Sequence, residues 1–394
     1  MVLTPVQWKK AKQQMAKSKF TLPVGYQKFH KDQLFNFQLN RWYSLGYMRL
    51  EDMKEVGQRV KTFKDWKTAM LERAEKAKSE QRLMEAAFFY RAAEFYTFQN
   101  DPDKELLYDK FTHLFYKAFR DDEIERFKVP YKETFMPAMK IPPAKDKYKG
   151  VIVMHGGFDS FMEEFYSMMR YFSDRGYEVI AFEGPGQGGA RKKYGLALDH
   201  EWEKPAKAVL DYFKLDDVTW FGMSMGGWLC FRAAAFEPRI KRVIASGIAF
   251  DYTQFPNIAG QLIMKLFFKH FRNFTNKVTL KKMKKDGMHT WTIGNLMYIT
   301  NEKTPADAAD VAFQMNEKNL HSDLVRQDVL VLTGREDHFI PFKMHDMQVK
   351  ALTNAKSVFA RVFTKEEQAQ NHCQIGNIGL ALDVILKWIS DVCR

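Results

Sequence analysis

The stretch WFGMSMGGW, residues 220–228, places one serine between two methionines and two glycines, directly after an apolar run. Gly222, Ser224 and Gly226 give the spacing G-x-S-x-G, whose glycines permit a sharp strand-to-helix turn that larger side chains would crowd. Such a turn projects the serine hydroxyl above the sheet, near the positive end of the following helix. We therefore predict that Ser224 is a nucleophile. The alternative is a turn that merely contains a serine, because five-residue matches also arise by chance.

A serine hydroxyl is a weak nucleophile unless a base accepts its proton, and the base needs an orienting acid. Downstream, the apolar run VLVLT precedes the loop GREDHFIP, which contains Asp337, and the stretch NHCQIGN before the C-terminal helix contains His372. The order Ser224, Asp337, His372 is the one that accompanies a serine in this type of turn. Glu336 and His338 compete with Asp337 within the same loop, but the spacing favours Asp337. For His372 the alternative is a packing or surface histidine.

Backbone N–H groups are needed to bind the negative charge that develops on a carbonyl oxygen under attack. We expect one of them from Met225, the residue after the serine. For the other we favour Gly157, in the stretch HGGFDS that follows a predicted strand, with Phe158 as the alternative. His155, which begins this stretch, is expected to orient the loop and not to act as a base.

The stretch GPGQGG, residues 184–189, matches the dinucleotide-binding spacing G-x-G-x-x-G. It follows a late strand, contains Pro185 within the turn, and lacks a clear acidic partner about 20 residues further on. We interpret it as a scaffold turn beside the active site. The sequence also shows no spaced set of His and carboxylate residues typical of a metal site. We therefore expect no cofactor of either kind.

The elements that must position these residues change character near residue 124. Residues 1–123 carry apolar residues at helical spacing and predict an N-terminal helical domain. In residues 124–394 short apolar strands alternate with amphipathic helices, which predicts an α/β domain with a mainly parallel sheet. After a pair of short strands, the expected strands are 151–155, 177–182, 218–221, 242–246, 328–333 and 357–364. Residues 255–320 hold helical and basic segments without a convincing strand, so we interpret them as a helical cap insertion.

Composition and charge restrict the setting. Hydrophobic residues make up 46% of the 394 and aromatic residues 15%, a globular composition. Three cysteines without paired spacing, an N-terminus without an apolar h-region and the absence of a long apolar run predict a cytoplasmic protein without a secretory signal or membrane span. The net charge of +13 is concentrated in residues 1–50 and 265–285. No nucleic-acid-binding motif accompanies these basic runs, so we interpret them as solvated helix faces and expect neither nucleic acid nor membrane as a partner.

With the motifs HGGFDS, FEGPGQG and GMSMGG, residues 124–394 resemble the α/β-hydrolase family. The segments DWKTAMLERAEKAK and AAFFYRAAEFY are similar to the N-terminal helical domain of one branch, which contains fermentation-respiration switch proteins, 2,6-dihydroxypseudooxynicotine hydrolase and fungal polyketide-shortening hydrolases. Glu183 stands where that branch often has Asp, a conservative departure. The resemblance implies an α/β-hydrolase fold with a helical cap and a cofactor-independent serine hydrolase that acts on a small molecule.

The family resemblance implies two chemistries for one triad, hydrolysis of an ester and hydrolysis of a C–C bond in a β-diketone-like compound. The second reaction releases a carbanion, which must be protonated or delocalised, and Asp159, Glu163 and Asp251 are the candidate carboxylates near the substrate. A structural role is the alternative for each. Aromatic and methionine side chains are expected to line an apolar pocket, among them Phe158, Met223, Met225, Trp228 and Phe255.

A second class of function is a non-catalytic protein that binds a partner on the same scaffold. A pure binder has no need to retain serine, aspartate and histidine at three separate loops, so the sequence favours the enzyme. The sequence leaves both a monomer and a homodimer open, and it does not decide between an ester and a C–C bond.

Overall fold

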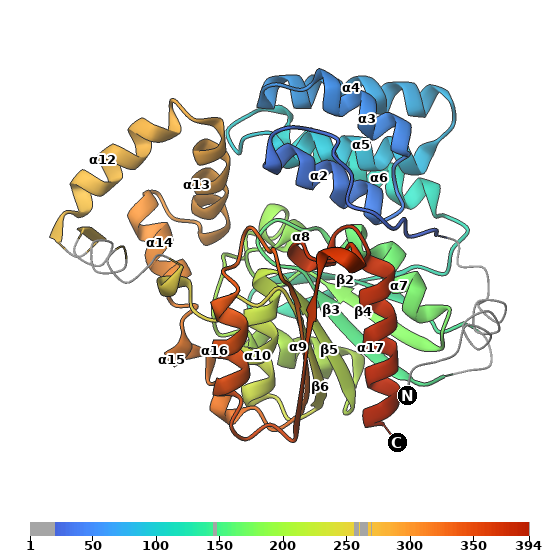
Figure 1. The fold of residues 1–394 in the computed structure, drawn as a ribbon, viewed down its shortest axis with the longest axis vertical. Helices are drawn as coiled ribbons and strands as arrows, with labels where there is room; N and C mark the ends of the chain where they lie inside the picture. Colours follow the sequence, from blue (N-terminus) through green and yellow to red (C-terminus); the bar gives the residue numbers. More distant parts are fainter. Residues whose placement is uncertain (1–19, 145–147, 256–259, 261–266, 269, 394) are drawn as a thin grey trace.

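The computed structural model describes residues 20–144, 148–255, 260, 267–268 and 270–393. Figure 1 shows an α/β core with a layer of N-terminal helices over one end of its sheet and a second helical group, the cap, beside that layer. The N-terminal helices and the cap therefore lie at the same end of the core.

One sheet of eight strands forms the centre of the core. Its strands are β1 (Glu125–Tyr131), β2 (Thr134–Ile141), β3 (Gly150–His155), β4 (Tyr177–Phe182), β5 (Val218–Met223), β6 (Ile240–Ser246), β7 (Asp328–Gly334) and β8 (Ser357–Phe363). They are ordered β1-β2-β4-β3-β5-β6-β7-β8. Strands β3 to β8 pair in parallel, whereas the hairpin of β1 and β2 joins β4 in the antiparallel sense. The carboxyl ends of the parallel strands consequently all lie at the same end of the sheet.

Helices cover both faces of this sheet, which is why its central strands are apolar on both sides. On one face lie α7 (Tyr166–Ser173) and α17 (Ile378–Val392), and on the other α9 (Glu203–Phe213), α10 (Met225–Phe236) and α16 (Lys343–Ala351). Alternation along β7 shows the division, since Leu330 and Leu332 pack on the α17 face while Val329 and Val331 pack on the α10 face. The short α8 (Gly188–Lys192) packs against β2.

Five helices precede the sheet in the described residues. They are α2 (Gln33–Ser44), α3 (Leu50–Arg59), α4 (Phe63–Ser79), α5 (Leu83–Tyr96) and α6 (Asp103–Ala118). Helix α5 is buried on all sides from Ala86 to Tyr96, as its nearly uninterrupted apolar sequence requires, and α4 and α6 pack against it. Side chains of these helices, including Trp42 and Phe88, belong to the same apolar core as Met154 of β3 and Leu330 of β7.

The cap contains α12 (Arg272–Met283), α13 (Gly287–Thr300), α14 (Pro305–Phe313) and α15 (Glu317–Leu320). The first part of the expected insertion, residues 256–259, 261–266 and 269, lies outside the described residues. Helix α13 connects the cap to the N-terminal layer, because Trp291 stacks on Phe95 of α5 with ring centroids 5.0 Å apart.

The predicted fold class is confirmed, with a mainly parallel sheet and a helical N-terminal region. Strand β4 matches the expected range 177–182, and each of the other strands expected in the parallel part differs at one end by one or two residues. Strand β5 continues through Met223 because Gly222 and Met223 still pair with β6. Glycine, which disfavours strands, hides this extension in the sequence. Among the described helices, none has both the length and the apolar character needed to cross a bilayer.

Candidate active site

Ser224 lies at a sharp turn between the end of β5 and the start of α10. Its φ of 58° falls in the left-handed region, which non-glycine residues adopt at strained functional turns. The two flanking glycines are required by space: a Cβ on Gly222 would lie 2.0 Å from the carbonyl oxygen of Gly226, and one on Gly226 would lie 2.5 Å from that of Gly156. The Ser224 N–H donates to the carbonyl of Ser246 on β6, 2.8 Å away, which fixes the turn to the sheet.

The structure brings His372 and Asp337 to this serine. Nε2 of His372 lies 2.9 Å from the Ser224 hydroxyl oxygen, and Nδ1 lies 2.6 Å from Oδ2 of Asp337. Asp337 follows β7, and its Oδ1 accepts N–H bonds from Phe339 and Ile340 at 2.9 and 3.0 Å. The three side chains therefore form one hydrogen-bonded line from three loops at the carboxyl ends of parallel strands.

The two ionisable members of this line shift each other's pKa. Burial alone would lower the pKa of His372, but the adjacent Asp337 carboxylate outweighs burial and raises the pKa well above its ordinary value. Burial alone would raise the pKa of Asp337, yet His372 and the two backbone donors hold it below its ordinary value. Asp337 is therefore an anion at neutral pH, and it stabilises a proton on His372.

The glycine loop after β3 lies against the turn that carries Ser224. A Cβ on Gly157 would stand 2.7 Å from the backbone nitrogen of Met225, so only glycine permits this approach. The carbonyl of Gly156 accepts a hydrogen bond from the Gln187 side-chain amide at 2.7 Å and lies 3.0 Å from Nδ1 of His155. Burial lowers the pKa of His155 to about 4, so this ring is neutral, in keeping with an orienting function.

Gln187 belongs to the GPGQGG stretch, so its hydrogen bond connects that stretch to the glycine loop. Glu183, just before it, accepts N–H bonds from Met162 at 3.0 Å and from Gly189 at 2.6 Å. Burial and the neighbouring Glu163 raise the pKa of Glu183 to about 8. The carboxyl group thus ties together the two segments that follow β3 and β4.

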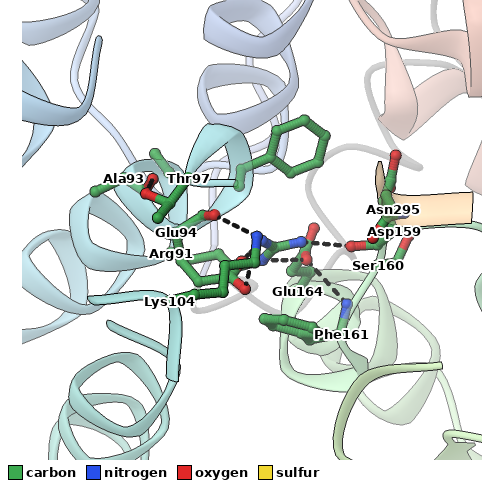
Figure 2. A network of polar contacts seen from close by, with 12 residues as sticks. Arg91, Ala93, Glu94, Thr97, Lys104, Asp159, Ser160, Phe161, Glu164 and Asn295 are labelled. Atoms are coloured by element: carbon green, nitrogen blue, oxygen red, sulfur yellow. Dashed lines mark hydrogen bonds and ion pairs between the residues drawn. The ribbon is translucent and has the colours of Figure 1, made fainter. Parts of the chain in front are cut away.

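Two arginines from the N-terminal helices also bind the segment that contains the glycine loop. Figure 2 shows the contacts of one of them. Arg91 of α5, with only 1% of its side chain exposed, donates to the Asp159 carbonyl at 2.5 Å and to Glu164 at 2.7 Å. Its remaining partner is Glu94. Arg41 of α2 pairs with Glu164 at 2.5 Å and with Asp159 at 3.2 Å. We call Arg41, Arg91 and their partners Glu94, Asp159 and Glu164 the arginine bracket.

The sequence reasoning missed the arginine bracket. A signal was present, since Arg91 and Glu94 are the charged residues within the otherwise apolar stretch AAFFYRAAEFY. Charged side chains are rarely fully buried unless they are paired, so their position on an all-apolar helix indicates a buried network. The other two partners of Arg91, Asp159 and Glu164, lie 68 and 73 positions further along the chain, and no local pattern identifies them.

A cavity of about 480 Å³ opens at Ser224. Its lining comes from all three parts of the chain: α2 and α5 of the N-terminal layer, α13 of the cap, and the core. Most of the lining is apolar, and the polar side chains that reach it include Gln38, Arg41, Asp159, Glu164, Thr292 and Gln374. This composition suits a small, largely apolar molecule held by a few polar contacts.

The candidate substrate-binding residues separate into two groups. Phe158 and Asp159 line the cavity, as do Met223, Met225 and Phe255. Glu163, Asp251 and Trp228 are not part of the described lining. Glu163 is buried and accepts a hydrogen bond from Tyr116 at 2.9 Å, Asp251 caps the short helix Tyr252–Gln254, and Trp228 is fully buried in the α10 core. The structural role named as the alternative thus accounts for the positions of Glu163 and Asp251, and Trp228 belongs to the core.

No group of three His, Cys, Asp or Glu side chains in the described part of the chain has the arrangement to hold a metal ion.

Comparison with known proteins agrees with this architecture. Residues 150–372 match the family model described as the alpha/beta hydrolase fold. Two fungal relatives are Hydrolase LUC6 from Fusarium sp, 28% identical over 284 residues, and 20-hydroxy-prefusarin hydrolase FUS2 from Gibberella moniliformis, 29% identical over 281 residues. Each alignment covers 64% of this chain and 66% of the relative, so the chain spans just under two thirds of their length.

Two solved structures share the fold across most of the chain. The 2,6-dihydroxy-pseudo-oxynicotine hydrolase superposes with a TM-score of 0.66 at 22% identity and covers 90% of this chain and 95% of its own. AbyA5 superposes with a TM-score of 0.66 at 18% identity and covers 91% and 95%. Both likenesses extend through the N-terminal helices, as the sequence resemblance to that branch predicts. With more than half of its residues matched by the family model, the chain belongs to the α/β-hydrolase family.

Proposed function

We propose that the protein is a cofactor-independent serine hydrolase that cleaves a small acyl compound, with Ser224 as nucleophile, His372 as general base and Asp337 as the orienting acid. The observation that carries this proposal is the hydrogen-bonded line of 2.9 Å and 2.6 Å at a strained turn that opens into an apolar cavity. A general base must lie within hydrogen-bond reach of the proton that it accepts, and His372 does.

In the proposed first step, Oγ of Ser224 attacks the substrate carbonyl carbon and its proton passes to Nε2 of His372. The carbonyl oxygen becomes an oxyanion, for which the backbone N–H groups of Met225 and Gly157 are the proposed donors. When the tetrahedral intermediate collapses, the bond to the leaving group breaks and His372 returns the proton to it. Water then attacks the acyl group on Ser224 by the same route and releases a carboxylic acid.

The same steps serve an ester and a β-diketone, and they differ in the atom that receives the proton. With an ester, the leaving oxygen takes it. With a β-diketone, the C–C bond breaks, its electron pair is delocalised into the second carbonyl as an enolate, and a carbon atom takes the proton. The names of the relatives, a 2,6-dihydroxy-pseudo-oxynicotine hydrolase and a 20-hydroxy-prefusarin hydrolase, support a small organic molecule as the substrate here.

Labelling with a fluorophosphonate tests the nucleophile, because such probes react rapidly only with a serine whose base is in place. We expect one adduct by intact-mass spectrometry, located on the Ser224 peptide and lost in Ser224→Ala. Ser160→Ala is the matched control, since Ser160 also lines the cavity and its loss leaves the hydrogen-bonded line intact. If the folded wild-type protein takes up no adduct, a non-catalytic binding protein replaces the hydrolase.

Turnover in D2O separates the two chemistries. A β-diketone that is hydrolysed yields a ketone with deuterium on the carbon that was cleaved, beyond the exchange measured in a sample with Ser224→Ala. An ester yields an acid and an alcohol without new C–D bonds. Mass spectrometry of the products from matched ester and β-diketone substrates identifies the reaction that the enzyme performs.

A further inference from the structure

The cavity does not end at Ser224 but continues down the face of the sheet that α7 and α17 cover. We call this continuation the apolar arm, and its walls are Phe221 of β5, Leu332 of β7, Met168 of α7, and Ala381, Leu382 and Ile385 of α17. All six side chains are buried, and each has at most 6% of its surface exposed. None of the six wall residues is charged; the charged or titratable residues in the described lining are Arg41, Asp159, Glu164 and His372.

The arm has a defined depth because one stripe of α17 forms its wall. Ile378, Ala381, Leu382 and Ile385 follow the spacing i, i+3, i+4, i+7 and therefore share one face of the helix. At 1.5 Å per residue, Ile378 to Ile385 covers about 10 Å along the helix. An extended alkyl chain with C–C bonds near 1.5 Å and angles near 111° advances about 1.25 Å per carbon. The arm consequently has the length of about eight carbons.

Space of this kind inside an apolar core calls for an occupant. Protein interiors are packed with few voids larger than a water molecule, and unfilled apolar space costs the contacts that its walls would otherwise make. Water does not fill it well, because a buried water needs polar partners, whereas apolar molecules enter such cavities readily. Among the four residues of α17 that line the cavity, Ala381 has the smallest side chain.

The mouth of the arm adds a polar contact. Gln374, two residues after His372, is 1% exposed and lines the cavity. Its Oε1 accepts a hydrogen bond from the hydroxyl of Ser246 at 2.8 Å, while its amide nitrogen is buried without a hydrogen-bond partner among the described residues. A buried donor without a partner is costly unless a ligand supplies an acceptor. A carbonyl or hydroxyl oxygen next to the scissile group fits this position.

We propose that the apolar arm binds an unbranched alkyl chain of about eight carbons attached to the scissile group, so that the substrate is an amphipathic acyl compound with its polar end toward the arginine bracket. This inference rests on the proposed function, because it assigns the chain relative to a carbonyl at Ser224. It extends that function by naming the substrate class and the helix that selects it.

Chain-length profiles test the arm. We expect kcat/KM for p-nitrophenyl esters to rise from acetate to octanoate, by about two- to fourfold per added methylene, and to fall at palmitate. A second series with the chain on the alcohol side, the alkyl acetates, shows which side of the scissile bond enters the arm. A rise in either series supports the proposal. A flat profile in both, from an enzyme that hydrolyses p-nitrophenyl acetate, overturns the arm but leaves the hydrolase. No hydrolysis of any ester or β-diketone overturns the proposed function itself.

Two substitutions at different depths sharpen the test. Ala381→Leu fills the upper part of the arm and is expected to reduce the octanoate-to-butyrate ratio of kcat/KM at least tenfold. Ile385→Phe fills only the far end and is expected to reduce the decanoate-to-hexanoate ratio while leaving hexanoate-to-butyrate close to the wild-type value. Val384→Phe is the matched control, because Val384 lies on the same helix but faces β8 instead of the arm.

The arm predicts that Ala381→Leu affects shorter chains than Ile385→Phe does. Equal profiles for Ala381→Leu, Ile385→Phe and Val384→Phe, each shown to be folded by far-ultraviolet circular dichroism, would place the chain elsewhere. Ratios are measured because a general loss of stability changes all substrates alike and cancels from them.

Discussion

At the scale of single residues, the proposed reaction depends on His372 accepting a proton while it is held next to a carboxylate. Asp337 raises the pKa of His372 well above its ordinary value, so the neutral base becomes available only as the pH rises through that shifted value. In the proposed reaction the same charge also stabilises the protonated ring that would form when Ser224 loses its proton. The proposed hydrolase would therefore lose activity at low pH, but its base would be stronger at high pH.

We expect kcat/KM to rise with pH as His372 loses its proton, with a midpoint above the ordinary histidine value of about 6.5. Asp337→Asn removes the charge that raises this pKa, so the midpoint moves to lower pH. The rate at the plateau also falls, by about a thousandfold or more, because the amide no longer holds the ring in the correct tautomer. A pH profile of ester hydrolysis measures both effects. An unchanged midpoint in Asp337→Asn would show that another group orients His372.

At the scale of elements, the arginine bracket connects the N-terminal helices to the loop that contributes Gly157. Arg91 reaches from α5 to the Asp159 carbonyl and to Glu164, and these acceptors lie two and seven residues after Gly157. Because Arg91 and Glu164 are both almost completely buried, removing Arg91 breaks a buried ion pair and leaves Arg41 as the one described cation that still pairs with Glu164. The helical layer thus positions the glycine loop in addition to covering it.

Arg91→Met should destabilise the protein by up to about 3–5 kcal/mol, the usual cost of breaking a buried ion pair from one side, with Arg41 and Lys104 still neutralising Glu164 and Glu94. It should also lower kcat about ten- to hundredfold, since small displacements of a reacting group have effects of that size. Arg91→Lys should recover part of both losses by restoring the charge. Urea unfolding and steady-state kinetics measure them.

Arg73→Met is the matched control for the bracket. Arg73 is a buried arginine of α4 that pairs with Asp52 at 3.1 Å and does not contact the glycine loop. It should lose stability but keep kcat in the folded fraction. Equal losses of kcat in the two variants would show that the arginine bracket only stabilises the fold and does not position the glycine loop.

At the scale of the whole molecule, the N-terminal helices and the sheet share one apolar core. Trp42 and Phe88 belong to the same buried cluster as Met154 and Leu330, which lie on the sheet face beneath α7 and α17. Neither part buries this surface without the other. We therefore expect the described chain to unfold as one cooperative unit, although its sequence changes character near residue 124.

We expect a single unfolding transition in calorimetry, with van't Hoff and calorimetric enthalpies that agree. Removal of residues 1–123 should expose the shared core and yield an insoluble or unfolded product, since a large exposed apolar surface favours aggregation. Two separate transitions, or a soluble and folded fragment of residues 124–394, would show that the helical layer is an independent domain.

Local signals in the sequence predicted the features that depend on neighbours along the chain. The G-x-S-x-G spacing predicts the turn at Ser224 because backbone crowding acts within five residues, and alternating strands and helices predict the mainly parallel sheet. The positions of Asp337 and His372 after their strands follow from the same topology, and the structure brings both to Ser224. What the sequence could not provide are contacts between distant segments. The arginine bracket and the apolar arm each require α2, α5, α7 or α17 to be placed first.

The cavity separates the parts of the chain that perform the proposed reaction from those that face the substrate. Ser224, His372 and Asp337 stand on loops of the sheet, whereas Gln38 of α2 and Trp291 of α13 belong to walls that contribute nothing to that hydrogen-bonded line. Substitutions in these walls alter which molecule fits without changing how it is cleaved. A lineage of such proteins can thus acquire new substrates by varying its walls, while the machinery that breaks the bond is inherited unchanged.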